Sequence, residues 1–313
     1  MRRFRFIADL SAIVDGPGLA EKARRAESIG YGTLVLGDHL LEQLAPMPAL
    51  ATIAAATDRV RIGTFVLNND LRHPAVLAQD LATLDVLSGG RLEIGIGAGW
   101  NAAEYAAIGA TFDSPGRRIE RMAEALAVLK GLLGEGPFSF EGRHYTITAL
   151  DGQPKPAQRP HPPFLIGGGG RRVLTIAARE ADTVGLAPIA AGGGKELAAD
   201  CLAPATTEKI AWVREAAGDR FDRLDLNVYP AVGPVRVTDH ARREAVKLAH
   251  RLASRYGADV SADQLLESPF VFIGSIDGLA AKFREARERF GINSITVFDM
   301  DQFAPVVERL AGT

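Results

Sequence analysis

The sequence predicts a single (β/α)8 barrel, and three observations support this fold class. Short apolar β-type runs alternate with helical segments along the chain, and eight such pairs can be counted. The runs are apolar without strict alternation, as in a parallel sheet that helices cover on its outer face. At 313 residues the chain is long for one ordinary domain but usual for such a barrel. A doubly wound open sheet is the rival fold, although such sheets usually have fewer strands.

The predicted elements follow one another in regular order. Pro17 suits the first turn of the first helix and Gly30 its end. The predicted strands span residues 5–10, 33–37, 60–67, 91–96, 164–166, 183–186, 224–229 and 294–298. The predicted helices span residues 17–29, 48–56, 74–87, 115–133, 171–180, 206–217, 277–290 and 302–310. We expect one domain over residues 1–313, with insertions at about 137–162, 188–204 and 239–268.

Each of these insertions carries a specific prediction, and the third is expected to be helical over residues 239–256 and 262–267. In the first, residues 138–147 have the pattern of a hairpin that turns at Glu141-Gly142. In the second, the stretch from Pro188 to Cys201 is rich in Ala and Gly and predicts a loop, where a substrate lid would lie.

Composition excludes several classes of function. A formal net charge of −2 argues against a nucleic-acid partner, because phosphate binding needs a basic surface. No apolar run approaches the ~20 residues that span a bilayer, and the N-terminus is too polar for a signal peptide. Cys201 is the only cysteine, so neither an intrachain disulfide nor a thiolate metal cluster can form. A cytoplasmic location is therefore predicted.

In a barrel the active site is built from the loops after the strands. His39 follows the second strand and could move a proton near neutral pH, or it could be a capping or surface residue. Asp38 could accept a hydrogen bond from a ligand or cap the next element. No second histidine follows at ligand spacing, so no metal site is predicted. The strand-end residues are Asp9, Asp38-His39, Thr64 to Asn69, Gly97 to Asn101, Gly167 to Gly170, Ala187-Pro188, Tyr229-Pro230 and Asp299.

Two glycine-rich segments follow predicted strands. The segment I-G-G-G-G-R-R (Ile166 to Arg172) could hold a phosphate on backbone amides at the start of a helix, or it could be a flexible connector. The segment G-I-G-A-G-W-N (Gly95 to Asn101) only partly fits a dinucleotide fingerprint, and a close approach of backbone to a flat ligand explains it better. Trp100 could line that ligand or simply pack against its neighbours.

Other chemistries have less support in the sequence. No serine lies in a G-x-S-x-G elbow and Cys201 lies in a featureless stretch, so a nucleophilic hydrolase has no positive sign. Paired carboxylates among Asp9, Asp38 and Asp299 leave acid/base work of the glycosidase type open.

Several longer motifs together carry a family resemblance. They are G-D-H-L-L (37–41), R-H-P-A-V-L-A-Q (72–79), A-T-L-D-V-L-S-G-G-R (82–91), G-I-G-A-G-W-N (95–101), P-P-F-L-I-G-G-G-G (162–170) and the terminal G-S-I-D and F-G-I-N-S-I-T-V-F. With these motifs the chain resembles the bacterial luciferase-like monooxygenase superfamily, whose members are flavin- or deazaflavin-dependent (β/α)8 barrels. It looks most like the branch that uses the deazaflavin coenzyme F420.

The resemblance implies a role for each matching residue. His39 would be catalytic at the reactive face of the cofactor, with Asp38 beside the ring. Thr64 and Phe65 match the position of a backbone bulge, often with a non-proline cis peptide, behind the ring. Small and polar residues would line the ring and ribityl chain, and glycines would hold the phosphate. The residues that would line the ring and ribityl chain are Gly97, Ala98, Gly99 and Asn101. The glycines that would hold the phosphate are Gly168, Gly169 and Gly170.

The reaction that the resemblance implies is hydride transfer between F420 and an unidentified small organic substrate. An FMN-dependent monooxygenase that works with a separate flavin reductase is an alternative, because the barrel motifs are shared. A non-catalytic family member that binds flavin, or has lost it, is a second alternative. The resemblance also implies a homodimer, with the second and third helices as contact surfaces.

Overall fold

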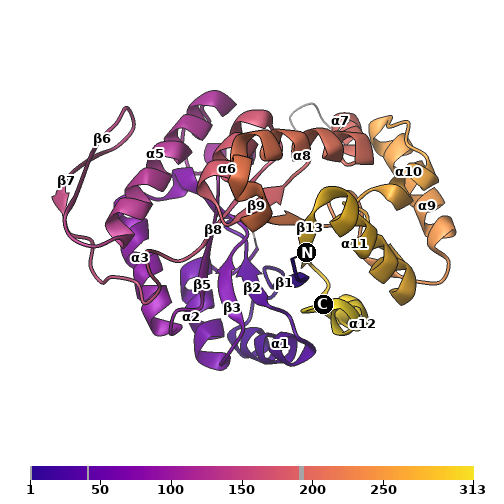
Figure 1. The fold of residues 1–313 in the computed structure, drawn as a ribbon, viewed down its shortest axis with the longest axis horizontal. Coiled ribbons are helices and arrows are strands. Elements are labelled where there is room, and N and C mark those ends of the chain that lie inside the picture. Colours follow the sequence, from indigo (N-terminus) through magenta and orange to yellow (C-terminus); the bar gives the residue numbers. More distant parts are fainter. Residues whose placement is uncertain (1, 41, 190–193) are drawn as a thin grey trace. The chain divides into compact units, whose positions relative to one another are not determined.

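The computed structural model describes residues 2–40, 42–189 and 194–313 (Figure 1). The chain forms two compact units. The N-terminal unit contains residues 10–25 and 34–166, and the C-terminal unit contains residues 2–9, 26–33 and the described residues from 167 onward. Leu41, the last residue of the G-D-H-L-L motif, and residues 190–193 of the predicted loop lie outside the described residues.

Four parallel strands form the centre of the N-terminal unit, in the order β2, β3, β5 and β8. β5 is buried along its whole length, as a strand covered on both faces must be. In register, Ile62 faces Leu92 and Ile94 faces Phe164. The strands are β2 (Thr33–Leu36), β3 (Arg61–Thr64), its short continuation β4 (Leu67–Asn68), β5 (Leu92–Gly97) and β8 (Phe164–Gly168).

Two glycines allow β3 and β5 to approach each other closely. A Cβ at Gly63 would meet the backbone oxygen of Glu93, and a Cβ at Gly95 would overlap the backbone oxygen of Thr64. Any larger residue at Gly95 would push the strand ends apart, so the second glycine-rich motif has a packing role at its first position.

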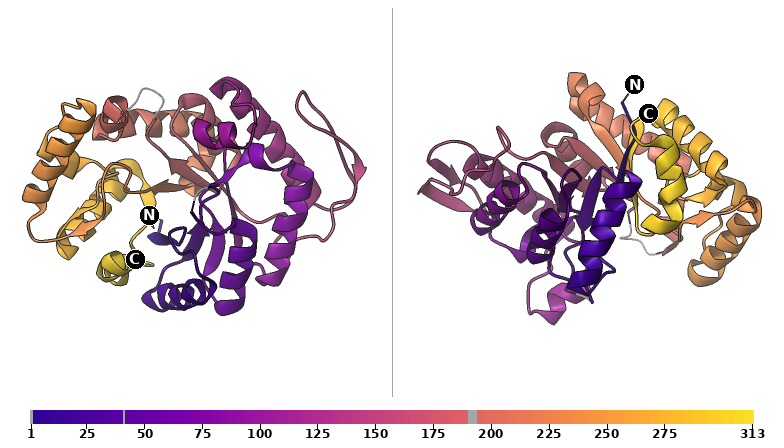
Figure 2. Two further views of the ribbon diagram at one scale, coloured as in Figure 1. Left: turned by 180° about the vertical axis from the view of Figure 1, so that it is seen from behind. Right: turned by 90° about the horizontal axis from the view of Figure 1, so that it is seen from below.

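Helices α2, α3 and α5 pack one after another along this unit (Figure 1). Each of these three begins with proline at one of its first positions, where a missing N–H costs nothing. The hairpin of β6 and β7 stands out beyond α5 (Figure 2). The elements are α1 (Gly16–Ile29), α2 (Pro46–Ala56), η1 (Asn69–Leu71), α3 (Pro74–Leu87), α4 (Ala102–Ala107), α5 (Pro115–Leu133), β6 (Phe138–Glu141) and β7 (Thr146–Leu150).

The C-terminal unit also has four parallel strands, in the order β1, β13, β10 and β9. Phe6 faces Ile295, and Leu226 faces Val184. The strands are β1 (Arg5–Asp9), β9 (Thr183–Leu186), β10 (Asp225–Val228) and β13 (Ile292–Val297), with the short pair β11 (Arg236–Val237) and β12 (Ile273–Gly274) beside them. The helices are α6 (Arg171–Glu180), α7 (Gly194–Asp200), α8 (Ala203–Ala217), η2 (Gly218–Arg223), α9 (Ala241–Tyr256), α10 (Ala262–Glu267), α11 (Ile276–Phe290) and α12 (Met300–Leu310).

The two units together contain the eight parallel strands that the sequence predicts. Three local predictions were incomplete or wrong. The predicted third strand is interrupted after Thr64 by a cis peptide between Phe65 and Val66. The short pair β11 and β12 was not predicted. The predicted Ala/Gly-rich loop contains α7, because Ala198 is buried in an apolar cluster with Leu248, Leu252 and Leu265.

The organisation as one domain stays a prediction. Among the helices in the described ranges, none is long and apolar enough to cross a membrane.

Candidate functional site

The candidate site of the N-terminal unit lies where β2, β3 with β4, and β5 end. Asp38 follows β2 and is almost completely buried, with 4% of its surface exposed. Its Oδ2 accepts hydrogen bonds from Arg72 Nη1 at 2.6 Å and from the backbone N–H of Asn68 at 3.0 Å, and its Oδ1 accepts one from Arg72 Nη2 at 3.0 Å. The carboxylate is thus tied to β4 and to the start of α3 by a bidentate ion pair.

His39 is held by a carboxylate that the sequence did not single out. Both side-chain oxygens of Glu104 lie 3.1 Å from His39 Nδ1. Glu104 Oε1 also accepts the backbone N–H of Leu40 at 3.1 Å, and the residue is 5% exposed. Because a carboxylate only accepts hydrogen bonds, Nδ1 carries the proton in this arrangement. The other ring nitrogen, Nε2, is then left to exchange a proton with a ligand.

Behind this pair, the ends of β3 and β5 are joined through Thr64. Its hydroxyl donates to the backbone oxygen of Gly95 at 2.7 Å and accepts from the backbone N–H of Gly95 at 3.0 Å. The predicted backbone irregularity is present, since the peptide between Phe65 and Val66 is cis. Both hydrogen-bonding capacities of the Thr64 hydroxyl are therefore used within the sheet, and the backbone N–H of Phe65 donates to the backbone oxygen of Leu36 at 2.8 Å.

The end of β5 carries a run of very small residues. Gly97, Ala98 and Gly99 leave the backbone there without bulky side chains. Gly99 has a φ of +75° and its Cβ would fall on the hydroxyl of Tyr105, so only glycine fits at this position. Asn101 caps α4 by accepting the N–H of Ala103 at 3.3 Å. This geometry suits a flat ligand laid against the backbone.

A polar network supports the loop after β4. The hydroxyl of Tyr105 lies 2.9 Å from Asn68 Oδ1 and 3.0 Å from Asp70 Oδ2. Burial, together with the nearby Asp70 carboxylate, raises the pKa of Tyr105 to about 12, so the phenol is a donor at neutral pH. Arg121 binds both oxygens of Asp70, at 2.8 and 3.1 Å, and reaches Asp113 at 2.8 Å. The loop is therefore fixed before any ligand arrives.

The predicted phosphate loop belongs to the C-terminal unit. Gly168 ends β8, and Gly170 is the residue before the first turn of α6. A Cβ at Gly168 would run into Val173 and one at Gly169 into the backbone oxygen of Ala187, whereas Gly170 faces open space. Close packing therefore requires glycine at positions 168 and 169. Gly170 leaves the amides at the start of α6 accessible, as anion binding requires.

Two other interpretations weighed from the sequence lose support. Asp299 caps α12 by accepting the N–H of Gln302 at 3.0 Å, which explains it without paired carboxylates. Cys201 is buried, and burial raises the pKa of its thiol to about 12, so it is no nucleophile. In the part of the chain that the structure describes, no group of three or more metal-ligating side chains comes together.

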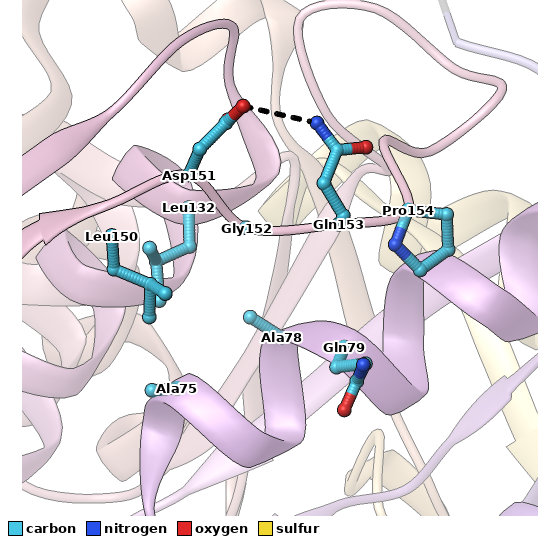
Figure 3. Close-up of a pocket in the computed structure, with 9 residues that line it drawn as sticks. All are labelled: Ala75, Ala78, Gln79, Leu132, Leu150, Asp151, Gly152, Gln153 and Pro154. Carbon is cyan, nitrogen blue, oxygen red and sulfur yellow. Dashed lines mark hydrogen bonds between the residues drawn. The ribbon is translucent and has the colours of Figure 1, made fainter.

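A pocket of about 260 Å³ lies on α3 and contains no predicted site residue among its described lining residues (Figure 3). It is lined by Ala75, Ala78, Gln79, Leu132 and residues 150–154.

Sequence reasoning missed Glu104, Arg72, Tyr105 and Arg121 as parts of the site, whereas Asn68 lies within the predicted strand-end residues 64–69. Glu104 lies on α4, and nothing in its local sequence pattern distinguishes it from a solvent-exposed acid. Arg72 could have been found, because it begins the R-H-P-A motif that follows the third strand.

Comparison with known proteins identifies the family. The model of the luciferase-like monooxygenase family matches residues 7–203. The chain belongs to this family. The family resemblance seen in the sequence is thereby confirmed.

Among relatives in this family, an F420-dependent glucose-6-phosphate dehydrogenase from Kineococcus radiotolerans is 34% identical over 221 residues, which are 68% of this chain. The match spans only 63% of that dehydrogenase. An FMNH(2)-dependent dimethylsulfone monooxygenase from Pseudomonas putida is 35% identical over 130 residues, or 42% of this chain and 36% of that enzyme. Members with either cofactor are therefore among the relatives.

Solved structures confirm the fold class. The coenzyme F420-dependent tetrahydromethanopterin reductase from Methanopyrus kandleri superposes with a TM-score of 0.76 at 20% identity, covering 99% of both chains. An F420-dependent secondary alcohol dehydrogenase in complex with an F420-acetone adduct gives 0.73 at 19% identity, covering 99% of this chain and 98% of that one. At this identity the likeness concerns the fold, which is the predicted (β/α)8 barrel.

Proposed function

We propose that this member of the luciferase-like family is an oxidoreductase that transfers hydride between coenzyme F420 and a small organic substrate. The observation that carries the proposal is the pair formed by His39 and the buried carboxylate of Glu104. A histidine fixed in one tautomer and 30% exposed can take or give a proton at Nε2.

The residues present fit a flat cofactor with an anionic tail. Gly97, Ala98 and Gly99 offer backbone without bulky side chains at the end of β5, which suits a planar ring. Asp38 and Thr64 fix that backbone, and Asn101 stands at the start of α4. In the C-terminal unit, Gly168 and Gly169 allow close packing and Gly170 leaves the start of α6 open to a phosphate. When bound, F420 supplies a two-electron hydride carrier.

The side chains of this chain do the remaining work. Glu104 orients the imidazole and stabilises its charged form when His39 accepts a proton from a substrate hydroxyl. In the opposite direction His39 returns the proton to a substrate carbonyl oxygen. Leu40 fixes the carboxylate through its backbone N–H, so the proton-transfer pair is rigid.

Titration with F420 and with FMN, followed by quenching of protein fluorescence, tests the choice of cofactor. We expect F420 to bind with the lower dissociation constant. Much tighter binding of FMN would favour the alternative of a two-component monooxygenase supplied by a separate reductase. Absence of binding by both would favour a non-catalytic member. His39→Ala should keep cofactor affinity and lose turnover, and full turnover in that variant would reject the catalytic role of His39.

We also propose that the protein forms a homodimer through α2 and α3. Three large apolar side chains of α3, Val76, Val86 and Leu87, are 48–65% exposed, and the pocket next to Ala75 and Ala78 could receive an apolar side chain of a second copy (Figure 3). Light scattering on Val76→Asp should show a smaller species than the unchanged protein. A cytoplasmic location stays a prediction.

A further inference from the structure

One buried ion pair of the C-terminal unit has no part in the chemistry proposed above. Lys209 on α8 is 1% exposed, and its Nζ donates to Oδ2 of Asp200, the last residue of α7. Nζ also lies 3.4 Å from the backbone oxygen of Asp200. Replacing a buried ion pair by apolar side chains of similar volume is often neutral for stability or even stabilising. Stability alone therefore does not explain a lysine at this position.

The carboxylate of this pair also fixes the chain just after β9. Asp200 Oδ2 accepts the backbone N–H of Ile189 at 2.6 Å, although 11 positions separate the two residues. The end of α7 is itself anchored, because α7 packs against α8 and α9 (Figure 1) and Ser268 Oγ donates to the backbone oxygen of Cys201 at 2.5 Å. The ion pair thus ties the backbone at Ile189 to a fixed helix end.

The segment that ends at Ile189 lies directly against the glycines after β8. The backbone N–H of Ala187 donates to the backbone oxygen of Gly168 at 3.0 Å. A Cβ at Gly169 would lie 2.4 Å from the backbone oxygen of Ala187, and 3.0 and 3.2 Å from Cγ1 and the backbone nitrogen of Ile189. The backbone of residues 187–189 therefore packs against these glycines, and a displacement of Ile189 would displace them as well.

From these contacts we infer that Asp200 and Lys209 are positioning residues for the phosphate of the cofactor. The inference rests on the proposed function, because it concerns the glycines to which that proposal assigns the phosphate. The ion pair holds Ile189, and residues 187–189 support the glycines. The start of α6 then keeps the orientation in which its amides face an anion. Asp200 and Lys209 act through this backbone and take no part in the transfer of hydride or proton.

Two double variants separate the charges of the pair from the hydrogen bond to Ile189. The acceptor-free variant, Lys209→Met with Asp200→Leu, removes both charges and the acceptor and leaves no buried charge without a partner. The acceptor-retaining variant, Lys209→Met with Asp200→Asn, also removes both charges but keeps a side-chain oxygen that can accept the N–H of Ile189. Lys247→Met with Glu244→Leu is the control, since this pair on α9 has a distance of 2.7 Å and the Lys247 side chain is 53% exposed.

The contribution of the phosphate to binding gives the first readout. F420 is titrated beside the same deazaflavin without its phosphate-linked tail, and FMN is titrated beside riboflavin. The measured quantity is the dissociation constant without the phosphate divided by that with it. In the acceptor-free variant this ratio should fall about tenfold, the order of one charge-assisted hydrogen bond. The acceptor-retaining variant should keep most of the ratio, and the control should keep all of it.

Two results of these titrations overturn the inference. The first is an unchanged ratio in the acceptor-free variant, even if both affinities fall together, because a general loosening of the fold weakens both ligands. The second is an equally large fall in the acceptor-retaining variant, because the hydrogen bond to Ile189 would then not be the cause.

Amide hydrogen exchange of the ligand-free protein gives a second readout that needs no cofactor. In the acceptor-free variant the amides of Ala187 and Ile189 should exchange at least about tenfold faster, because their local opening becomes easier, whereas the amides of β10 and β13 keep their rates. Unchanged exchange at Ala187 and Ile189 overturns the inference.

The proposed function and the positioning role fail in different ways. If the unchanged protein binds neither F420 nor FMN, the proposed function fails, and the role toward the phosphate fails with it. If the unchanged protein binds F420 and the ratio is the same in all variants, the proposed function stands and only the positioning role is wrong.

Discussion

Removing either partner of the ion pair between Asp38 and Arg72 should destabilise the protein strongly, although the pair lies beside a site and not in the apolar core. The Asp38 side chain is 3% exposed and that of Arg72 is 25% exposed, with 2.6 Å between the closest oxygen and nitrogen. Breaking a buried pair by deleting one partner costs about 3–5 kcal/mol, because the remaining charge is left without compensation.

The two deletions differ in what they leave behind. Arg72→Ala strands a carboxylate that is almost fully enclosed and retains only the N–H of Asn68. We therefore expect a loss of about 3–5 kcal/mol for this variant. Asp38→Ala strands a guanidinium that water can still reach, so its cost falls lower, at about 2–3 kcal/mol. The double variant removes both charges and should be about 1.5–3 kcal/mol more stable than the sum of the single losses predicts.

Urea unfolding followed by circular dichroism measures these differences, provided that the slope of free energy against urea is unchanged. Glu215→Ala serves as the control, because Glu215 is also ion-paired, with Arg171 at 3.0 Å, but both side chains are more than 60% exposed. That control should lose less than about 1 kcal/mol. Losses for Asp38→Ala and Arg72→Ala as small as the control, or strict additivity in the double variant, would refute the reasoning.

Three further predictions concern the residues around this pair. Glu104→Gln should lower kcat about ten- to 150-fold without loss of cofactor affinity, since a charge-assisted hydrogen bond of about 1.5–3 kcal/mol to His39 is replaced; an unchanged kcat measured by cofactor absorbance would contradict this. Gly99→Ala should lower cofactor affinity and the unfolding temperature together, because its Cβ would fall on Tyr105 at a positive φ; an unperturbed unfolding temperature would count against it. Burial alone would raise the pKa of Glu124, but three backbone N–H groups of the hairpin turn offset this and lower it. Because the folded pKa is depressed, this contribution to stability is present above the unfolded pKa of about 4.3 and is lost as pH falls through the folded pKa. The difference in unfolding free energy between the unchanged protein and Glu124→Gln should therefore shrink in acid, and a pH-independent difference would exclude the ionised carboxylate as the cause.

Local pattern was sufficient for most of the fold. The helix from Pro115 to Leu133 and the strand from Thr183 to Leu186 have the predicted bounds. Local signals, such as the proline with which this helix begins, are enough to mark these ends. The break after Thr64 and the helix α7 could not be derived in the same way. The first depends on the conformation of one peptide bond, and the second on burial of Ala198 among residues 50 or more positions further along the chain.

In the candidate site, too, some residues could be identified from local sequence and others only from the fold. His39 and the glycines could be chosen as candidates from the sequence, because they follow predicted strands, where the active site of such a barrel is built; their functional role stays a prediction. Glu104 was not, since 65 residues separate it from His39 in the sequence and only the fold brings its carboxylate to the ring. The same holds for Arg121, whose contact with Asp70 joins residues that are 51 positions apart.

In the turn from Gly37 to His39, the neighbouring residues Asp38 and His39 have different hydrogen-bond partners and different roles. The backbone N–H of Gly37 donates to Ser11 Oγ at 2.7 Å, and its backbone oxygen accepts from Gln43 Nε2 at 3.0 Å, so the turn is pinned on both sides. Asp38 accepts three hydrogen bonds, one from Asn68 and two from Arg72, and has little capacity left to accept a hydrogen bond from a ligand. The ring of His39 uses only Nδ1 for a hydrogen bond, which it forms with Glu104. The sequence pattern left a capping role open for both residues, and the family resemblance implied that both lie at the cofactor. Their hydrogen bonds show that Asp38 fixes the turn, whereas His39 keeps Nε2 for the proton transfer proposed above.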